Sequence, residues 1–187
     1  MEEFEKKILL SGKEYDILMT HFEKSGSTTR QVNYYFDTDD FLMNKRGVTC
    51  RIREKNGKLK ATYKDHRQAK CFCSEEISCG IRNGLEDNDF TNMGLTYQGC
   101  LDTYRTLILK NSFCTITVDR NEYLGTIDYE LEAEYQKGHE FSVMSCVKDL
   151  LEFLDILEKS ENFDEVDRRT TGVKSKSERF FERKSKL

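Results

Sequence analysis

A regular alternation of charged and apolar residues is the feature of this sequence that most restricts its fold. Residues 128–135 read Asp-Tyr-Glu-Leu-Glu-Ala-Glu-Tyr, and residues 2–10 alternate in a similar way. Because successive side chains of a strand point to opposite faces of a sheet, each segment places its charges on one face and its apolar groups on the other. The period of two predicts antiparallel strands that are apolar on one face only.

The other segments predict an α+β protein. Ser-x-x-Glu capping boxes at Ser11 and Ser175 predict helix starts, and an apolar stripe predicts a helix over 142–159 with Ser142 as its cap. In chain order, the predicted elements are a strand (2–10), a helix (11–26), a strand (31–38), a short turn or helix (39–45), a hairpin (48–65), a strand (70–81), a loop with a short helix (83–100), three strands (104–112, 113–121, 124–135), a helix (142–159) and a C-terminal helix. So many antiparallel strands favour a closed or nearly closed β-barrel with helices packed outside.

Length and composition predict one domain, residues 1–187, in the cytoplasm. The chain contains no proline, which suits paired strands because proline cannot donate to a ladder. No apolar run approaches the ~18 residues that span a bilayer, and the first seven residues, MEEFEKK, lack the regions of a signal peptide. Seven cysteines without paired spacing predict reduced thiols. No membrane partner is expected, and the oligomeric state stays open, a homodimer included.

Charge is nearly balanced over the chain, at 30 Lys+Arg against 34 Asp+Glu. This balance disfavours a nucleic-acid partner bound by bulk positive charge, but it allows a local basic site. The four carboxylates of residues 128–134 repel one another at spacings of about 6.6–7 Å, so they need counter-charge or a metal. Basic residues on other predicted strands supply counter-charge: Arg51, Arg53, Lys60, Lys64 and Arg105.

Two orientations of the charged strand faces are open. Each charged row could face water, as is usual in antiparallel sheets. Alternatively, the helices cover the apolar faces, and the charged faces line the interior of a wide barrel that holds a ligand. In such an interior, basic groups bind phosphates and carboxylates bind Mg²⁺ or Mn²⁺. Together these groups favour metal-dependent chemistry on a polyphosphate.

Several motifs resemble those of a known family. Glu3-Phe-Glu5-Lys-Lys7 resembles the ExExK signature at the N-terminus of the CYTH superfamily, the triphosphate tunnel metalloenzymes. Further counterparts follow in the family's order: Asn33-Tyr-Tyr-Phe-Asp-Thr38, Gly47, Arg51-Ile-Arg53, Lys64, Arg105, Asp119, Asp128-Tyr-Glu130-Leu-Glu132 and a basic C-terminal segment. The resemblance covers residues 2–183 and is greatest to the short bacterial single-domain branch.

This resemblance implies an eight-stranded antiparallel tunnel, closed as a barrel, with a triphosphate bound inside. It implies Mg²⁺ or Mn²⁺ as cofactor, with metal ligands at Glu3, Glu5, Asp119, Glu130 and Glu132. It implies phosphate contacts from Lys7, Arg51, Arg53, Lys64 and Arg105. Among the acidic residues, Glu5, Asp119 and Glu132 are implied to be catalytic, by positioning the metal and the attacking water.

Some neighbouring residues remain alternatives for the interior. On the last acidic strand, the inward-facing pair is either Glu130 with Glu132 or Glu132 with Glu134. Either Glu75 or Glu76 faces the interior. Lys176 and Arg179 either reach the substrate or lie in a solvated tail. The histidines, His21, His66 and His139, are expected at the surface, because no two of them have the spacing of metal ligands.

Three functions are compatible with these features. The first is a metal-dependent triphosphatase that hydrolyses inorganic tripolyphosphate or an organic triphosphate, with a small-molecule triphosphate or polyphosphate as its partner. The second is a class IV-like adenylate cyclase, in which the ribose 3′-hydroxyl replaces water. The third is a non-catalytic module that binds polyphosphate or a phosphorylated ligand. The carboxylates disfavour the third, because anion binding gains nothing from them.

Overall fold

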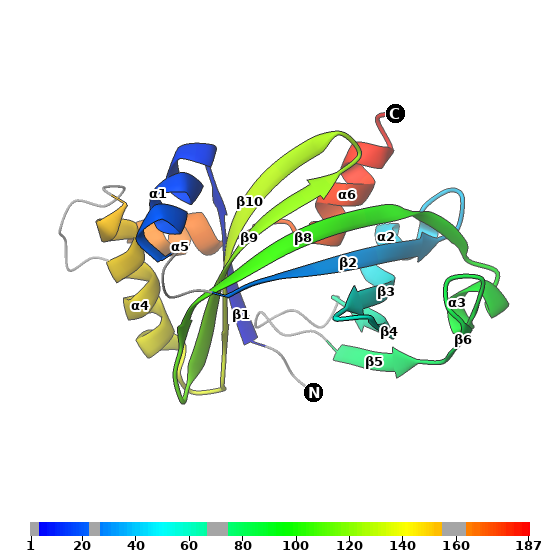
Figure 1. Cartoon of the computed structure of the whole chain (residues 1–187), viewed down its shortest axis with the longest axis horizontal. Coiled ribbons are helices and arrows are strands. Elements are labelled where there is room, and N and C mark those ends of the chain that lie inside the picture. Colours follow the sequence, from blue (N-terminus) through cyan, green and yellow to red (C-terminus); the bar gives the residue numbers. More distant parts are fainter. Residues whose placement is uncertain (1–3, 23–26, 67–74, 155–163) are drawn as a thin grey trace.

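The computed structural model describes residues 4–22, 27–66, 75–154 and 164–187, which form a curved antiparallel sheet with helices packed on it (Figure 1). Glu3 lies outside the described residues, and so do the side chains of Glu75 and Glu76. Within the described ranges, no helix combines the length and the apolar character needed to cross a membrane.

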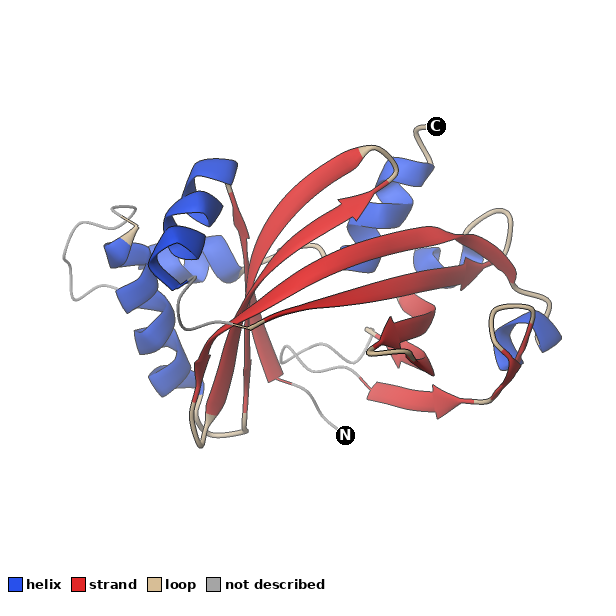
Figure 2. Ribbon diagram, viewed as in Figure 1, coloured by secondary structure: helices blue, strands red, loops and turns tan. Residues whose placement is uncertain are grey.

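Eight strands form one sheet in the order β1-β10-β9-β8-β2-β3-β4-β5, and every neighbouring pair is antiparallel (Figure 2). The strands are β1 (Phe4–Leu10), β2 (Thr28–Asp37), β3 (Val48–Lys55), β4 (Lys58–Asp65), β5 (Glu75–Cys79), β8 (Thr96–Lys110), β9 (Cys114–Tyr123) and β10 (Thr126–Tyr135). A separate two-stranded sheet pairs β6 (Ile81–Asn83) with β7 (Asp87–Asn88). The predicted α+β class and the eight antiparallel strands are confirmed.

The closed barrel is not confirmed, because the sheet is open in the described part of the chain. Strands β1 and β5 are its two edges, and no backbone pairing between described residues joins them. Side chains approach across part of the opening, where Lys64 Nζ of β4 lies 3.9 Å from Glu5 Oε1 of β1. Attraction between opposite charges, rather than a backbone ladder, therefore links the two sides of the sheet at this point.

Helices α1 (Gly12–Phe22), α4 (Glu140–Phe153) and α5 (Asp164–Thr170) cover the apolar face of β1, β9 and β10 (Figure 1). Ile8, Leu131 and Val147 are at most 1% exposed in this core. Burying one such side chain stabilises the fold by about 1.5–3 kcal/mol. The alternation in the sequence predicted this apolar face correctly.

The C-terminal helix α6 (Lys176–Lys184) packs on the opposite, inner face of the sheet, which corrects the prediction that all helices lie outside. Its Phe180 and Phe181 are buried against inner-face side chains of β2, β8 and β9: Tyr35, Leu101 and Tyr123. The helix begins as predicted, because Ser175 Oγ accepts from the Glu178 N–H at 3.3 Å and the Ser175 N–H donates to Glu178 Oε2 at 2.7 Å. Two adjacent phenylalanines give α6 apolar surface that requires burial.

The starts of one strand and one helix differ from expectation. Strand β8 begins at Thr96, inside the predicted loop. Gly99 allows this strand to pass close to α6, because a Cβ atom at position 99 would lie only 2.9 Å from Phe180 Cζ. The φ angle of Gly99, +134°, also favours glycine. Helix α4 begins at Glu140 after His139, so Ser142 is not its cap. The short helices α2 (Leu42–Lys45) and α3 (Asp89–Asn92) lie within the two segments for which a short helix was expected.

Candidate functional site

A polar cavity of about 330 Å³ lies on the inner face of the sheet. Charged side chains from five elements line it: Glu5 and Lys7 (β1), Arg51, Arg53 and Lys55 (β3), Lys60 and Lys64 (β4), Arg105 (β8), and Glu132 and Glu134 (β10). Lys176 of α6 completes the charged lining described by the structure. Of the two orientations left open by the sequence, the charged faces therefore take the interior one.

Strands β3 and β4 form the basic wall of this cavity, defined here as Arg51, Arg53, Lys60 and Lys64. Hydrogen bonds hold its two guanidinium groups: Arg51 Nε donates to Thr62 Oγ1 at 3.1 Å, and Arg53 Nε donates to Asn33 Oδ1 at 2.9 Å. A guanidinium held in this way is pre-organised and loses less freedom when it binds an anion. The wall is thus built to receive negative charge.

Glu5 connects the basic wall to the acidic side of the cavity. Its Oε1 accepts a hydrogen bond from Lys7 Nζ at 2.6 Å and lies 3.9 Å from Lys64 Nζ. Burial by itself lowers the pKa of Lys7, but Glu5 and Glu132 raise it, so that the pKa ends above its ordinary value. Lys7 is therefore a permanent cation at neutral pH.

Three buried carboxylates form the acidic cluster, defined here as Asp119, Glu130 and Glu132, and Glu132 also lines the cavity. Asp119 and Glu130 are register partners on β9 and β10, and both are 0% exposed. One oxygen from each of the three carboxylates lies within 4.8 Å of the others. The structure thus groups Glu130 with Glu132, whereas the side chain of Glu134 is half exposed further along β10. Hard oxygen ligands of this kind fit Mg²⁺ or Mn²⁺.

Arg105 holds the acidic cluster from β8. Its Nε and Nη2 donate to both oxygens of Asp119, at 2.9 and 2.7 Å, and Nη2 also lies 3.1 Å from Glu132 Oε1. Such bidentate, charge-assisted contacts are among the stronger hydrogen bonds in proteins. Arg105 therefore fixes two carboxylates while it also lines the cavity.

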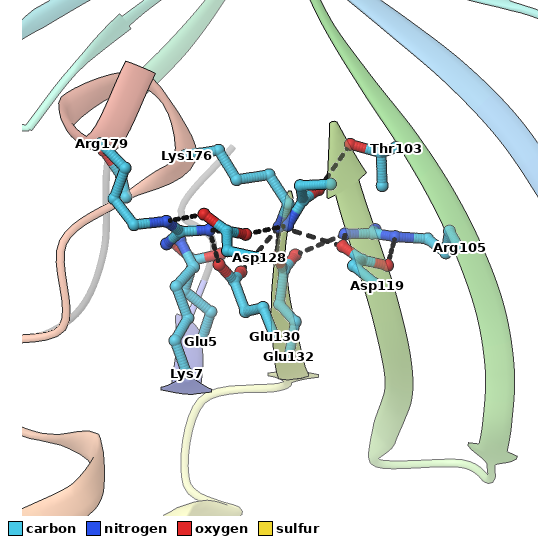
Figure 3. A network of polar contacts seen from close by, with 12 residues as sticks. Glu5, Lys7, Thr103, Arg105, Asp119, Asp128, Glu130, Glu132, Lys176 and Arg179 are labelled. Carbon is cyan, nitrogen blue, oxygen red and sulfur yellow. Dashed lines mark hydrogen bonds and ion pairs between the residues drawn. The ribbon is translucent and has the colours of Figure 1, made fainter. Parts of the chain in front are cut away.

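The N-terminal turn of α6 supplies two more cations to this cluster (Figure 3). Lys176 Nζ lies 3.0 Å from Asp119 Oδ2, 2.6 Å from Glu130 Oε1 and 2.9 Å from Glu132 Oε2. Arg179 donates to Asp128 Oδ2 at 2.9 Å and to Glu130 Oε2 at 2.7 Å. The capping box at Ser175 predicted this helix, and residues three apart share a face. No local pattern in the sequence indicated where that face would dock.

Burial and these cations act in opposite directions on the acidic cluster. Burial raises the pKa of Glu130 above its usual value, despite the attraction of Lys176 and Arg179. Burial also acts to raise the pKa of Glu132, but Lys176 and Arg105 hold that pKa well below its usual value. Glu132 is therefore ionised at neutral pH, and its charge depends on its cationic neighbours.

His66 lines the cavity, which corrects its expected surface role. Its Nε2 lies 3.1 Å from Thr49 Oγ1, and that hydroxyl lies 2.7 Å from Ser177 Oγ of α6. Burial, with Lys64 and Lys7 nearby, lowers the pKa of His66 to about 4. The Thr49 hydroxyl therefore links β3 to α6 and also contacts a neutral imidazole in the lining of the cavity. No sequence pattern predicted this placement, because His66 lies just past the end of β4.

The cysteine thiols are expected to have no role in ligand binding or turnover in the cavity. Cys50 is 2% exposed among apolar neighbours of β3, and burial raises its pKa to about 12. None of the described residues that line the cavity is a cysteine. Treating the folded protein with iodoacetamide at neutral pH should therefore change ligand binding and turnover by less than about twofold, because the thiolate is the reactive form. Loss of function upon selective modification of Cys50 would mean that β3 faces the other way.

Fold and site together define a class of protein in which one curved antiparallel sheet encloses both a basic wall and a cluster of carboxylates. The chain matches the CYTH domain over residues 1–167, and it belongs to the CYTH domain family. Its resemblance to that family is therefore confirmed.

Individual relatives agree with this assignment. The chain is 28% identical over 152 residues to the "Putative triphosphatase YjbK" of Bacillus subtilis (strain 168), which covers 74% of this chain and 80% of the relative. A Bacillus halodurans structure described as a "putative adenylate cyclase" has a TM-score of 0.69 at 22% identity and covers 96% of this chain and 97% of that one. A Hippeastrum protein, described as a "putative adenylyl cyclase" with a dominant triphosphatase activity, has a TM-score of 0.61 at 17% identity, with coverage of 93% and 98%. The two structures support the fold.

Proposed function

We propose that this protein is a metal-dependent triphosphatase that hydrolyses inorganic tripolyphosphate or an organic triphosphate in the cavity. The observation that carries the proposal is that one cavity is lined both by the basic wall and by Glu132, a member of the acidic cluster. The description "Putative triphosphatase" of the B. subtilis relative supports it, and so does the dominant triphosphatase activity stated for the Hippeastrum protein.

In this proposal the cationic side chains bind the phosphoryl groups: Lys7, Arg51, Arg53, Lys64 and Arg105. Side chains two residues apart on a strand are separated by about 6.6–7 Å. The long side chains of Arg51 and Arg53 therefore reach different phosphoryl groups of one extended chain. Fixed cations aimed at these oxygens stabilise the charge that develops during phosphoryl transfer, so no side-chain nucleophile is required.

The acidic residues hold the metal in this proposal. Asp119, Glu130 and Glu132 are the three carboxylates that lie close enough together to share a metal ion, and the proposal adds Glu3 and Glu5 as further ligands. Mg²⁺ or Mn²⁺ bound there would neutralise phosphate charge and lower the pKa of a bound water. Glu5, Asp119 and Glu132 orient the metal and the attacking water. The tunnel form of the cavity belongs to the same proposal and is supported by the Lys64–Glu5 contact across the opening.

One assay separates the triphosphatase from its alternatives. Purified protein is incubated with tripolyphosphate, ATP or thiamine triphosphate, with Mg²⁺ or Mn²⁺, and phosphate, pyrophosphate and cyclic AMP are measured. We expect phosphate release from tripolyphosphate. Cyclic AMP with pyrophosphate would instead identify a cyclase, and binding without any product would identify a binding module. Tyr35 and His66 are the described lining residues that carry rings, and Tyr35 is 1% exposed, so the described lining offers little surface on which a base could stack.

A further inference from the structure

The ammonium group of Lys176 lies at the centre of the acidic cluster. Lys176 Nζ lies 2.6–3.0 Å from an oxygen of each of three carboxylates, and it donates hydrogen bonds to two of them, Glu130 and Glu132. The three partners are the same residues that form the candidate metal site: Asp119, Glu130 and Glu132. Figure 3 shows the side chain reaching down from α6 between these carboxylates.

We infer that the Lys176 ammonium and a divalent metal occupy the acidic cluster alternately, so that Lys176 is a built-in competitor of the metal. This inference rests on the metal site of the proposed function. A cation of 2+ charge bound by the same three oxygens would lie within a few Å of the ammonium, where like charges repel strongly in a buried site. One of the two must leave before the other binds.

The structure also indicates how Lys176 leaves. The helix that carries it is anchored elsewhere, because Phe180 and Phe181 are at most 3% exposed and Arg179 remains paired with Asp128. A long lysine side chain can therefore rotate while α6 stays in place. Lys176 already lines the cavity, so the displaced ammonium moves toward the space that the phosphates would occupy. The same residue thus stabilises the carboxylates without metal and faces the substrate with metal.

Metal affinity without substrate tests this inference. Mn²⁺ binding is titrated by electron paramagnetic resonance for the unmodified protein and for Lys176→Met, with Lys176→Gln as a second variant in case the methionine variant does not fold. Lys174→Met is the matched control, because it removes the same charge two residues away, from an exposed side chain paired with Glu182. Asp119→Asn tests the metal site itself.

We expect Lys176→Met to bind Mn²⁺ at least tenfold more tightly than the unmodified protein, which corresponds to about 1.4 kcal/mol. Lys174→Met should change the affinity by less than twofold. In EDTA, the Lys176 variant should melt at a lower temperature, because its carboxylates lack their cation, and Mn²⁺ should raise its melting temperature by more than it raises that of the unmodified protein. The Lys176 ¹⁵N ammonium signal, assigned by its absence from Lys176→Met, should shift on addition of Mg²⁺.

Other outcomes overturn the inference in distinguishable ways. Equal Mn²⁺ affinities for the unmodified protein and both Lys176 variants, with affinity lost in Asp119→Asn, would reject competition but retain the metal site. An equal gain in Lys174→Met would show that overall charge, rather than occupancy of the cluster, controls affinity. Absence of Mn²⁺ binding in every variant would reject the metal site and the competition together.

Discussion

Glu132→Gln should lower kcat/KM for tripolyphosphate by ~100-fold or more at saturating metal, the loss that removal of one preorganised electrostatic contact typically causes. The substitution keeps the shape of the side chain but removes one of the three charges of the acidic cluster. It also removes the negative charge that lies 2.9 Å from Lys176 Nζ and 3.1 Å from Arg105 Nη2. Loss of one partner from a buried ion pair costs about 3–5 kcal/mol, so a thermal melt must accompany the kinetics and rates must be compared per folded molecule.

Glu134→Gln is the matched control for this experiment. Glu134 lies on the same face of β10, one inward-facing position further along, but its side chain is half exposed and its contact with Arg105 is longer, at 3.6 Å. We expect its rate to stay within about threefold of the unmodified protein, since exposed ion pairs contribute little. If Glu134→Gln were the damaging substitution and Glu132→Gln the harmless one, the acidic cluster would be assigned one position too early on β10.

Arg53→Ala should lower kcat/KM for tripolyphosphate by at least tenfold. A hydrogen bond to a charged group is worth about 1.5–3 kcal/mol, and 1.4 kcal/mol corresponds to a factor of ten. Arg53→Lys should recover the rate only in part, because lysine cannot contact a phosphoryl group with two parallel donors. Steady-state kinetics at fixed metal concentration measure both effects.

Ile52→Ala is the control for Arg53, because Ile52 is the neighbouring residue on the opposite face of β3. It is 0% exposed in the apolar core that includes Phe36 and Phe90. The substitution should lower the free energy of unfolding by about 2–5 kcal/mol and leave turnover per folded molecule unchanged. Control of turnover by Ile52 together with an inert Arg53 would contradict the placement of a polar cavity on the inner face.

Much of the site follows from strand parity, which the sequence already contained. On β1, β3 and β10 the pleat places every second side chain on one face, so Lys7, Arg53 and Glu132 were expected to share an interior, and all three line the cavity. The same parity placed Ile8 and Leu131 in the apolar core. Residue preferences were less informative for the start of β8. This segment includes Gly99 and was predicted to be a loop. Contact with α6 explains that error, because the glycine lets the strand pass Phe180 closely.

The position of α6 could not be predicted in the same way. Its capping box and its paired phenylalanines are local signals, and they predicted the helix. Its docking on the inner face depends on a pocket between Tyr35, Leu101 and Tyr123, which come from three different strands. That docking carries Lys176 to a carboxylate 46 residues earlier in the chain. Whether the edge strands β1 and β5 pair could not be predicted from local patterns either, because it depends on the curvature of the whole sheet.

Local sequence patterns therefore predict which side chains share a face, because the direction of each side chain on a strand or a helix is set by a few neighbouring bonds. Which faces then meet depends on how the whole chain packs. The contact of Lys176 with Glu130 and the contact of Thr49 with Ser177 join residues that are 46 and 128 positions apart in the chain. Such contacts are selected by the burial of apolar surface and the neutralisation of charge over the whole fold, and no short stretch of sequence contains that information.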